Sequence, residues 1–320
     1  MISEDQTFEL DIEQLFAQGL RLYRSILCPA CKMHYAIIAN SISGTMPLSK
    51  KLAILDESRQ ILNAKIHGLD TRTPGELAQC ARKIAASCDV LVVAGGDGSF
   101  SVIINSVDTT RIPIAFLPLG TGNALRYALG YEGGPEDIAR RIKHGKIHEL
   151  DLLGCGENKR GFMMSVGIEG TVIQMYNRYL SRGHGGFCAY LAGFIKAYFR
   201  EYRRTNARIT VDNETFRVKN LLSLMVAKQP YYGFGMKVVP MATFNDGLVH
   251  TLSVNSGFFG CAVGAVTSFT GGNQIGQHVA GRQALVRLET PLPLQIDGDL
   301  VSHNDVFSFS VLPKALRIKY

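Results

Sequence analysis

The sequence lacks the features that mark exported, disulfide-bonded and repetitive proteins. Its first residues, MISEDQTFELDIEQ, are acidic and contain neither the basic start nor the apolar run of a secretory signal, so we expect a cytoplasmic protein. The seven cysteines are scattered between Cys28 and Cys261, and an odd, scattered set does not form a disulfide framework. No internal repeat or low-complexity segment stands out. These absences indicate a soluble globular protein of a reducing compartment.

Residues 252–272 carry no charge over about the length that a bilayer span requires. Glycines, serines, threonines and Asn255 interrupt this stretch, whereas membrane spans are usually richer in Leu and Ile. We therefore expect a strand followed by a buried helix here.

The chain has 320 residues, of which 46% are hydrophobic, and this favours two domains over one. Residues 1–33 form an extension with a predicted helix at 11–27, followed by a CxxC pair, Cys28 and Cys31, which is a weak metal or redox signal. Residues 34–150 alternate strand and helix with near-continuous apolar strands, which predicts an α/β domain with a parallel sheet.

The texture changes after residue 150 to short β-like runs separated by turns. Residues 151–304 predict a mostly antiparallel β-sandwich with helices near 171–203 and 256–270. We expect the last segment, 305–320, to pack back on the first domain.

A glycine-rich turn, AGGDGS, follows one of the apolar strands. Gly95, Gly96 and Gly98 let backbone N–H groups approach a ligand closely. The helix predicted after Ser99 adds the partial positive charge of its N-terminus, which favours phosphate oxygens. Asp97, the carboxylate in this turn, suits a Mg²⁺ ion or a hydroxyl group rather than the anion itself.

A second glycine loop, PLGTGNAL, follows the next strand. Gly120 and Gly122 are accompanied here by two side-chain donors, Thr121 and Asn123. Ligands of parallel sheets bind at the carboxyl ends of the strands, so two such loops can grip a nucleotide between them. Either loop alone also suits a plain strand-to-helix connection. Neither matches GxxxxGK[ST] or GxGxxG, which disfavours a P-loop enzyme and a dinucleotide-type Rossmann site.

Taken in order, the motifs resemble those of a known superfamily. ANSISG, TRTPGELAQCAR, GGDGS and LPLGTGN, and then SVGIEG, PMATFNDGLVHTLSV and PLQIDGDL, follow the motif order of the diacylglycerol kinase, sphingosine kinase and bacterial lipid kinase superfamily. The resemblance spans residues 34–320. It implies a nucleotide-binding domain shaped like that of NAD kinases, joined to a β-sandwich, and ATP-dependent phosphorylation of a lipid hydroxyl.

The resemblance also implies where the nucleotide and a metal ion bind. ATP would lie between the domains on Asn40, Thr71, Gly95, Gly96, Gly98, Ser99, Gly120, Thr121 and Asn123. In TFNDGL the superfamily places a metal site that uses the Asp246 carboxylate and the main-chain oxygens of Thr243 and Leu248, a donor set that suits Mg²⁺. NDG is also a good β-turn sequence in any protein.

Asp297 and Asp299, in IDGDL, are the candidates for acting on the acceptor hydroxyl. Phosphoryl transfer needs a carboxylate that orients or deprotonates the attacking group. The superfamily commonly has Asp-Gly-Glu here, so Asp299 is one methylene shorter. A second departure is Val102, because many members of the superfamily have Glu at this position. If that Glu helps to hold a metal ion or water in the relatives, its role in this chain is vacant or is taken by Asp97 or Glu169.

Basic residues gather between positions 178 and 208, where Glu201 is the one acidic residue. They are Arg178, Arg182, Lys196, Arg200, Arg203, Arg204 and Arg208. A helix in this segment either packs on the sandwich with a solvated basic edge or presents that edge to anionic lipid headgroups. No base-reading module accompanies the patch, so nucleic acid is not an expected partner.

The sequence thus predicts a cytoplasmic, peripherally membrane-associated lipid kinase that uses ATP and Mg²⁺. Two alternatives stay open. One is an NAD kinase, which shares the GGDG loop. The other is a nucleotide- or lipid-binding relative with impaired catalysis, for which Val102 and Asp299 are the grounds. The acceptor lipid stays open among diacylglycerol, sphingoid bases and related lipids, and so does the oligomeric state, a homo-oligomer included.

Overall fold

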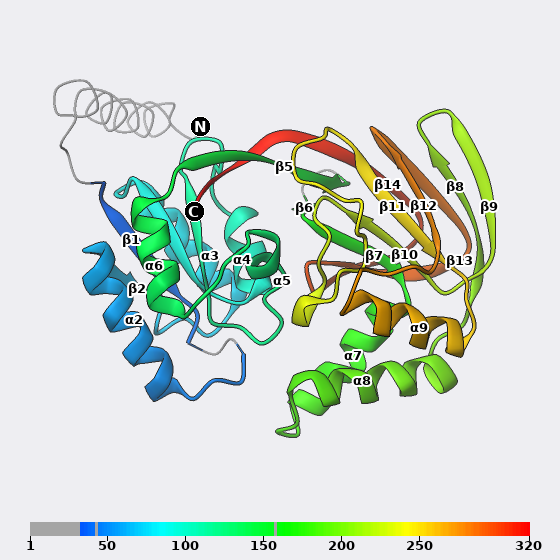
Figure 1. Ribbon diagram of the computed structural model, residues 1–320, viewed down its shortest axis with the longest axis horizontal. Coiled ribbons are helices and arrows are strands. Elements are labelled where there is room, and N and C mark those ends of the chain that lie inside the picture. The colour runs from blue at the N-terminus through cyan, green and yellow to red at the C-terminus, as the bar shows by residue number, and fades with distance from the viewer. Residues whose placement is uncertain (1–32, 42–43, 157–158) are drawn as a thin grey trace, which may run out of the picture.

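In the computed structural model, four parallel strands form the sheet of the first lobe, in the order β4-β3-β1-β2 (Figure 1). They are β1 (Tyr35–Ala39), β2 (Lys65–His67), β3 (Val90–Gly95) and β4 (Ile114–Pro118). Every residue of β1, β3 and β4 is buried, because their apolar sequences are covered on both faces. The predicted α/β architecture is confirmed. The structure describes residues 33–41, 44–156 and 159–320, so the predicted helix at 11–27 and the CxxC pair lie outside the described residues.

Helices connect these strands. They are α2 (Leu48–Leu62), α3 (Pro74–Ala85), α4 (Asp97–Ile104), α5 (Ala124–Ala128) and α6 (Pro135–His144). The start of α3 is fixed by a capping box, in which the Thr73 side chain accepts a hydrogen bond from the Glu76 N–H and the Glu76 side chain reaches back to the Thr73 N–H. Helix α6 is not among the predicted helices, because its charged sequence, PEDIARRIKH, buries only Ile138, Ala139 and Ile142.

The second lobe is an antiparallel sandwich. Its strands are β5 (Ile147–Cys155), β6 (Lys159–Gly161), β7 (Met163–Gly167), β8 (Thr205–Val211), β9 (Glu214–Leu221), β10 (Ser223–Ala227), β11 (Val249–Val254), β12 (Gln277–Gly281), β13 (Gln283–Ile296) and β14 (Asp299–Lys319). In Figure 1, α7 (Ile168–Leu180), α8 (Gly186–Lys196) and α9 (Phe258–Ser268) lie together below the strands. A π-helical turn, Ala197–Glu201, extends α8. The antiparallel sandwich and its inserted helices match the prediction.

Strand β14 joins the two lobes. Its first half pairs with β13 in the sandwich, and its last residues pair with β5 and, at Ile318, with Ile114 of β4. Each lobe has its own hydrophobic core, and Leu316 and Ile318 belong to the core of the first lobe. The lobes are therefore connected through one continuous sheet, and a cleft lies between them.

The uncharged segment 252–272 folds as the end of β11 followed by α9, so the predicted strand-then-helix order is confirmed. The predicted burial of the helix is wrong. Only Gly264 and Ser268 of α9 are buried, whereas Phe259 is 85% exposed. Among the described residues, no helix has both the length and the apolar character to cross a bilayer.

Candidate active site

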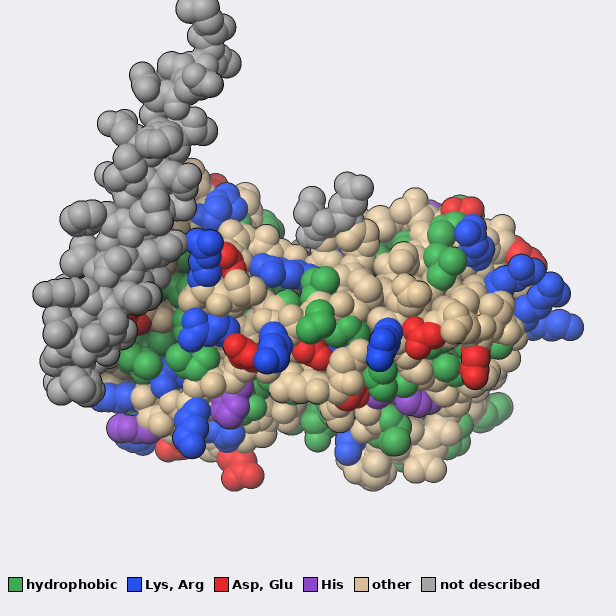
Figure 2. Space-filling view, turned by 90° about the horizontal axis from the view of Figure 1, so that it is seen from above, with side chains coloured by type: hydrophobic (Ala, Val, Ile, Leu, Met, Phe, Trp, Pro, Cys, Tyr) green, Lys and Arg blue, Asp and Glu red, His purple; other side chains and the backbone are tan. Residues whose placement is uncertain are grey.

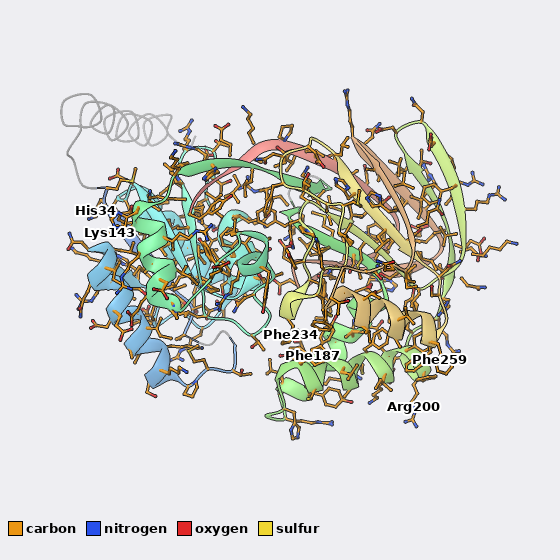
Figure 3. The ribbon with its side chains drawn as sticks, viewed as in Figure 1. His34, Lys143, Phe187, Arg200, Phe234 and Phe259 are labelled. Carbon is orange, nitrogen blue, oxygen red and sulfur yellow. The ribbon has the colours of Figure 1, made fainter. Side chains whose placement is uncertain are left out.

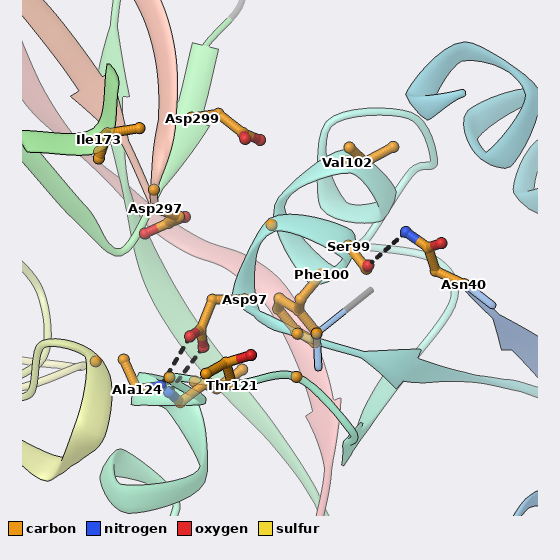
Figure 4. A pocket seen from close by; sticks show the side chains of 18 of the residues that line it. Asn40, Asp97, Ser99, Phe100, Val102, Thr121, Ala124, Ile173, Asp297 and Asp299 are labelled. Atoms are coloured by element: carbon orange, nitrogen blue, oxygen red, sulfur yellow. Dashed lines mark hydrogen bonds between the residues drawn. The ribbon is translucent and has the colours of Figure 1, made fainter. Parts of the chain in front are cut away.

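A cleft of about 440 Å³ lies between the lobes (Figure 4). The glycine loops after β3 and β4 line one side of it, and the turn between β13 and β14 lines the other. The two glycine loops lie together because the parallel strands β3 and β4 end at the same edge of the sheet. The turn between β13 and β14 is held beside them because β14 runs from the second lobe into the first, where it pairs with β4. The cleft therefore collects most of the residues that the motifs singled out.

The two glycine loops pack backbone against backbone. A Cβ atom on Gly120 would lie 2.4 Å from the Cα of Gly96, a distance that no side chain tolerates. The Gly95 carbonyl accepts hydrogen bonds from the N–H groups of Leu119 and Gly120, at 2.8 and 3.2 Å. Glycine is thus required at Gly120 by close approach, and the contact makes the loops one rigid unit.

Asp97 ties the first loop to the second. Its carboxylate accepts hydrogen bonds from the N–H groups of Ala124 and Leu125, at 2.9 and 3.2 Å, and so caps the start of α5 (Figure 4). Burial raises the pKa of Asp97, although these hydrogen bonds act to lower it. The Asp97 carboxylate, which was predicted to bind a metal ion or a hydroxyl group, therefore holds the two loops together through these hydrogen bonds.

Ser99 and Asn40 meet at the other side of the first loop. The Asn40 side-chain amide donates a hydrogen bond of 3.0 Å to the Ser99 hydroxyl oxygen (Figure 4). Both residues line the cleft beside the N-terminus of α4, which begins at Asp97. Thr71 also lines it, and its hydroxyl donates to the Gly68 carbonyl at 2.6 Å. This wall offers polar groups and a helix N-terminus to an anion.

Seven of the nine predicted nucleotide residues line the cleft: Asn40, Thr71, Gly96, Gly98, Ser99, Gly120 and Thr121. Gly95 and Asn123 do not. Gly95 is buried as the last residue of β3, and the Asn123 side chain bonds to the N–H and carbonyl of Gly120, at 3.1 and 2.8 Å. Gly95 and Asn123 therefore stabilise the two loops and do not line the cleft.

Asp297 anchors the turn that faces the loops. Its carboxylate accepts hydrogen bonds from the N–H groups of Phe162 and Met163, the shortest of them 2.9 Å. Burial raises the pKa of Asp297 to about 7, and the nearby carboxylates of Asp97 and Asp299 add to this rise. Both oxygens thus accept backbone hydrogen bonds, which hold the turn in place, and Asp297 also lines the cleft.

Asp299 faces the first glycine loop directly across the cleft. Both of its carboxylate oxygens lie 3.8 Å from the position that a Cβ atom on Gly98 would take (Figure 4). Among the described residues, no hydrogen bond to this carboxylate is found, and burial raises its pKa while Lys159 acts to lower it. Of the two predicted acceptor-side carboxylates, Asp299 is the one available to a ligand.

Val102 lines the same cleft on the helix that starts at the first loop. Its side chain is half-buried and packs against the core of the first lobe. No other acidic side chain takes its place in the cleft, because the lining acids among the described residues are Asp97, Asp297 and Asp299. The predicted alternative that Glu169 takes this role is wrong, because Glu169 lines a different pocket.

That second pocket, of about 250 Å³, is apolar and adjoins the cleft. It lies among α7, α8, α9 and strands β10 and β11, and Tyr190 and Tyr232 line both spaces. Glu169 is its one acidic lining residue, and its Oε1 accepts a hydrogen bond of 2.5 Å from the Ser223 hydroxyl. Burial raises the pKa of Glu169 to about 7.

A segment that no sequence motif predicted closes the cleft from the second lobe. Tyr231, Tyr232, Gly233 and Phe234 line the cleft, and the Phe234 N–H donates a hydrogen bond of 2.9 Å to the Gly122 carbonyl. Phe234 has a positive φ of 64° and lies beside Phe187 of α8 (Figure 3). The run YYGFG carried the only signal, a glycine-flanked aromatic cluster.

The predicted metal loop already holds a side-chain cation. The Nζ of Lys228, a residue with a fully buried side chain, lies 2.7 Å from Asp246 Oδ1 and 3.0 Å from the Leu248 carbonyl oxygen. The Thr243 hydroxyl donates to Asp246 Oδ2 at 2.7 Å. The oxygens of Asp246 and Leu248 that would bind a metal ion are thus bonded to an ammonium group. Thr243, Asp246 and Leu248 therefore do not fit the predicted Mg²⁺.

Comparison with known proteins identifies both lobes. The family model of the diacylglycerol kinase catalytic domain matches residues 34–155, and that of the YegS C-terminal NAD kinase beta sandwich-like domain matches residues 163–320. A Shewanella frigidimarina protein named "Probable lipid kinase YegS-like" is 26% identical over 264 residues, which cover 78% of this chain and 84% of the relative.

Two further relatives carry the name diacylglycerol kinase. One, from Staphylococcus saprophyticus, is 28% identical over 177 residues, which cover 53% of this chain and 55% of the relative. The other is a solved structure of a Bacillus anthracis protein, which superposes with a TM-score of 0.66 at 17% identity and covers 90% of this chain and 97% of that one. The fold of this structure is shared over nearly the whole described chain.

Proposed function

Because this chain belongs to the superfamily of diacylglycerol kinases and bacterial lipid kinases, we propose that it transfers the γ-phosphoryl group of ATP to a lipid hydroxyl. One observation carries the proposal. The available carboxylate of Asp299 faces Gly98, in the loop suited to phosphate groups, across a cleft that adjoins an apolar pocket. A phosphate donor and an apolar acceptor can thus meet at one carboxylate.

The first lobe would hold the nucleotide. The backbone at Gly96 and Gly98 and the hydroxyl of Ser99 lie at the N-terminus of α4, where N–H groups and the helix dipole favour phosphate oxygens. ATP would enter as its Mg²⁺ complex, in which the ion would neutralise charge on the phosphates. Gly120 and Thr121 border the same space, and Asp97 keeps the two loops in register.

Asp299 would act on the acceptor. In the transfer step, the lipid hydroxyl oxygen forms a bond to the γ-phosphorus while the bond from that phosphorus to the bridging oxygen breaks and ADP leaves. The hydroxyl proton passes to Asp299, whose carboxylate is free of protein donors in the described chain. Asp297 fixes the turn through Phe162 and Met163 and thereby positions Asp299.

The apolar pocket would take the acyl or alkyl chain of the acceptor. Its lining is almost entirely apolar or aromatic, and Tyr190 and Tyr232 connect it to the cleft. Glu169 is the one acidic residue of its lining, and its Oε1 accepts a hydrogen bond from Ser223. An acceptor with an amino, amide or hydroxyl donor at this depth, such as a sphingoid base, would give Glu169 a further partner, whereas a diacylglycerol would not.

The outer surfaces of α8 and α9 would face the membrane that supplies the lipid. The helices are antiparallel neighbours, because Phe187 contacts Phe269 at one end and Phe199 contacts Phe258 at the other. Their exposed large side chains are Phe187, Leu191, Ile195, Phe199, Phe259, Val263, Val266 and Phe269. An exposed apolar face of this extent marks a contact with a membrane or a protein. We favour a membrane, since the pocket lies directly beneath it.

Basic residues border this apolar face, as an anionic membrane requires. Arg200 and Arg203 are exposed, and Arg200 points away from the lobe in Figure 3. Arg204 was predicted to belong to the same basic edge. It is not available to a membrane there, because its guanidinium group donates to the carbonyl oxygens of Asn255 and Ser256. Figure 2 looks onto the opposite side of the molecule, where acidic and basic side chains are interspersed with small hydrophobic groups.

Incubation with radiolabelled ATP, Mg²⁺ and a fractionated total lipid extract, with NAD offered in a parallel reaction, tests the proposal. We expect label in a lipid fraction with the wild type and none with Asp299→Asn. Label in NAD would favour the NAD kinase alternative. Calorimetric binding of ATP without transfer to any lipid would favour the impaired relative, for which Val102 is the structural ground.

A further inference from the structure

We propose that the ammonium group of Lys228 permanently replaces the metal ion that the loop 243–248 would hold, so that this junction of the two lobes needs no divalent cation. The inference starts from the contacts of Lys228 alone. It does not depend on which phosphate acceptor the protein uses, and it goes beyond the proposed kinase activity.

Three oxygens surround the three N–H donors of Lys228. Its Nζ lies 2.7 Å from Asp246 Oδ1, 3.0 Å from the Leu248 carbonyl oxygen and 3.3 Å from Asp151 Oδ2. The Lys228 side chain is 0% exposed and the Asp151 side chain only 8% exposed. Two carboxylates and a main-chain carbonyl are the donors that a hard divalent cation prefers. These three oxygens form a cation site, and the cation in it is the ammonium group of Lys228.

A metal ion cannot share this position with the lysine. Mg²⁺ and Ca²⁺ need oxygen ligands at about 2.0–2.6 Å, and the oxygens of Asp246 and Leu248 already bond to Nζ. An ion placed among the same oxygens would lie within about 4 Å of a buried ammonium group, where like charges repel strongly. One cation or the other can occupy the site.

The second oxygen of the Asp246 carboxylate also has partners. Asp246 Oδ2 accepts from the Thr243 hydroxyl and lies 2.6 Å from Nε2 of His250. Asp246 Oδ1 accepts from the Leu248 N–H at 3.0 Å as well as from Lys228. Both oxygens of Asp246 are therefore engaged by protein donors, as the partner of a buried ammonium group requires.

The site fastens the wall of the cleft to the junction of the lobes. Asp151, in β5, accepts hydrogen bonds from the N–H groups of Gly247 and of Lys314 in β14. Lys228 follows β10 directly, and its own N–H donates to the Phe162 carbonyl at 2.8 Å. The next residue, Gln229, lines the cleft. The ammonium group thus positions the segment that closes the site from the second lobe.

The wild-type protein alone gives the first test. Its melting temperature is measured without nucleotide in EDTA, in Mg²⁺ and in Ca²⁺, so that no metal enters with ATP. We expect the three values to agree within about 1 °C, since a cation that binds no folded site adds no stability. Elemental analysis should find no bound divalent ion. A melting temperature that rises and saturates with either ion would overturn the replacement.

Lys228→Asn gives the second test, because it removes the cation and leaves the oxygens. In EDTA we expect its melting temperature to fall by roughly 10 °C, as loss of one partner from a buried ion pair is strongly destabilising. Mg²⁺ or Ca²⁺ should recover part of this loss. Two controls frame the result. Lys219→Asn changes an exposed lysine and should alter nothing, and Lys228→Met fills the space with an apolar chain and should not recover.

Each outcome of the second test decides. Recovery of Lys228→Asn alone supports the inference. Equal recovery of Lys228→Met would show that the ion binds elsewhere, and recovery of neither variant would show that the oxygens form no site for a divalent cation. Unchanged stability in Lys228→Asn would show that the ammonium group does not stabilise this junction. Each of these three results would overturn the inference, and none bears on whether the protein phosphorylates a lipid.

Discussion

The carboxylate of Asp97 and the backbone N–H of Ala124 are joined by a hydrogen bond of 2.9 Å that connects the two glycine loops. The residues are 27 positions apart, and each lies at the start of a helix that opens toward the cleft. A carboxylate whose oxygens already receive backbone donors is held in one orientation, and so are the loops on both sides of it. The two loops are thereby held in one arrangement before any ligand arrives.

Asp97→Ala should lose both stability and nucleotide binding. The variant removes the cap of α5, and loss of such a cap costs about 0.5–2 kcal/mol. Urea unfolding should show this decrease, and calorimetry should show ATP affinity reduced by tenfold or more. Asp97→Asn keeps one accepting oxygen and should retain most of the stability. If Asp97→Ala bound ATP as the wild type does, the loops would not depend on this brace.

Asp299 should be needed for turnover and not for folding. Asp299→Asn should lower kcat by roughly a hundredfold or more, because general-base assistance contributes about 10²–10⁴. Asp299→Glu should keep substantial activity, since the cleft is open at this side chain. Because burial raises the pKa of Asp299, wild-type activity should rise with pH as the carboxyl group loses its proton. Unchanged turnover in Asp299→Asn would remove it from the mechanism.

The sequence was sufficient to predict the sheet, the glycine loops and the acids of the cleft. Apolar strands followed by glycine turns are local signals, and the carboxyl ends of parallel strands must meet. The individual roles of the carboxylates were not predictable. Asp97, Asp297 and Asp299 look alike in sequence. Only the structure shows that the carboxylates of Asp97 and Asp297 accept backbone hydrogen bonds, whereas in the described chain the carboxylate of Asp299 accepts none.

Other features depended on contacts between distant segments. Lys228 stands 18 residues before Asp246 and gave no sign that its side chain would fill the predicted metal loop. Helix α9 looked like a buried element because its sequence carries no charge, and periodicity alone cannot reveal that no described segment covers its outer face. Phe234 joins the cleft through a bond to Gly122, 112 positions earlier, which no local pattern encodes.

Glu169 should make stability fall as the pH rises. Burial raises the pKa of Glu169 from the ordinary 4.5 to about 7, so between these values the folded state holds a proton that the unfolded state has lost. The contribution of this group is therefore most favourable below about pH 4.5, falls from there to about pH 7 and is constant above it.

Glu169→Gln should remove that fall, so the stability of the variant relative to the wild type should rise from about pH 4.5 to about pH 7 and stay constant above it. Urea unfolding at a series of pH values measures it, with Glu214→Gln, an exposed substitution, as the control. Parallel pH dependence in the wild type and Glu169→Gln would mean that Glu169 is ionised throughout. A long-chain amine that binds the wild type and not Glu169→Gln would place a donor of the acceptor at this carboxyl group.

The apolar face of α8 and α9 should decide membrane binding. Phe199 and Phe259 are 62% and 85% exposed, and aromatic side chains on neighbouring helices insert at the boundary between headgroups and acyl chains. Changing both to Ser should reduce sedimentation with vesicles of any charge. Changing Arg200 and Arg203 to Ala should reduce it only with anionic vesicles, by about tenfold or more, because each basic residue near the surface contributes about 1 kcal/mol.

Matched substitutions separate membrane binding through α8 and α9 from a general effect of the protein's positive charge. Arg82→Ala with Lys83→Ala removes two exposed basic residues from α3, in the other lobe, and should leave vesicle binding unchanged. Since the apolar pocket proposed to take the lipid chain lies beneath α8 and α9, the Phe199 and Phe259 variants should also phosphorylate a lipid in vesicles slowly yet accept a short-chain, water-soluble lipid normally. Equal loss on both substrates would mean that these side chains serve the pocket and not the membrane.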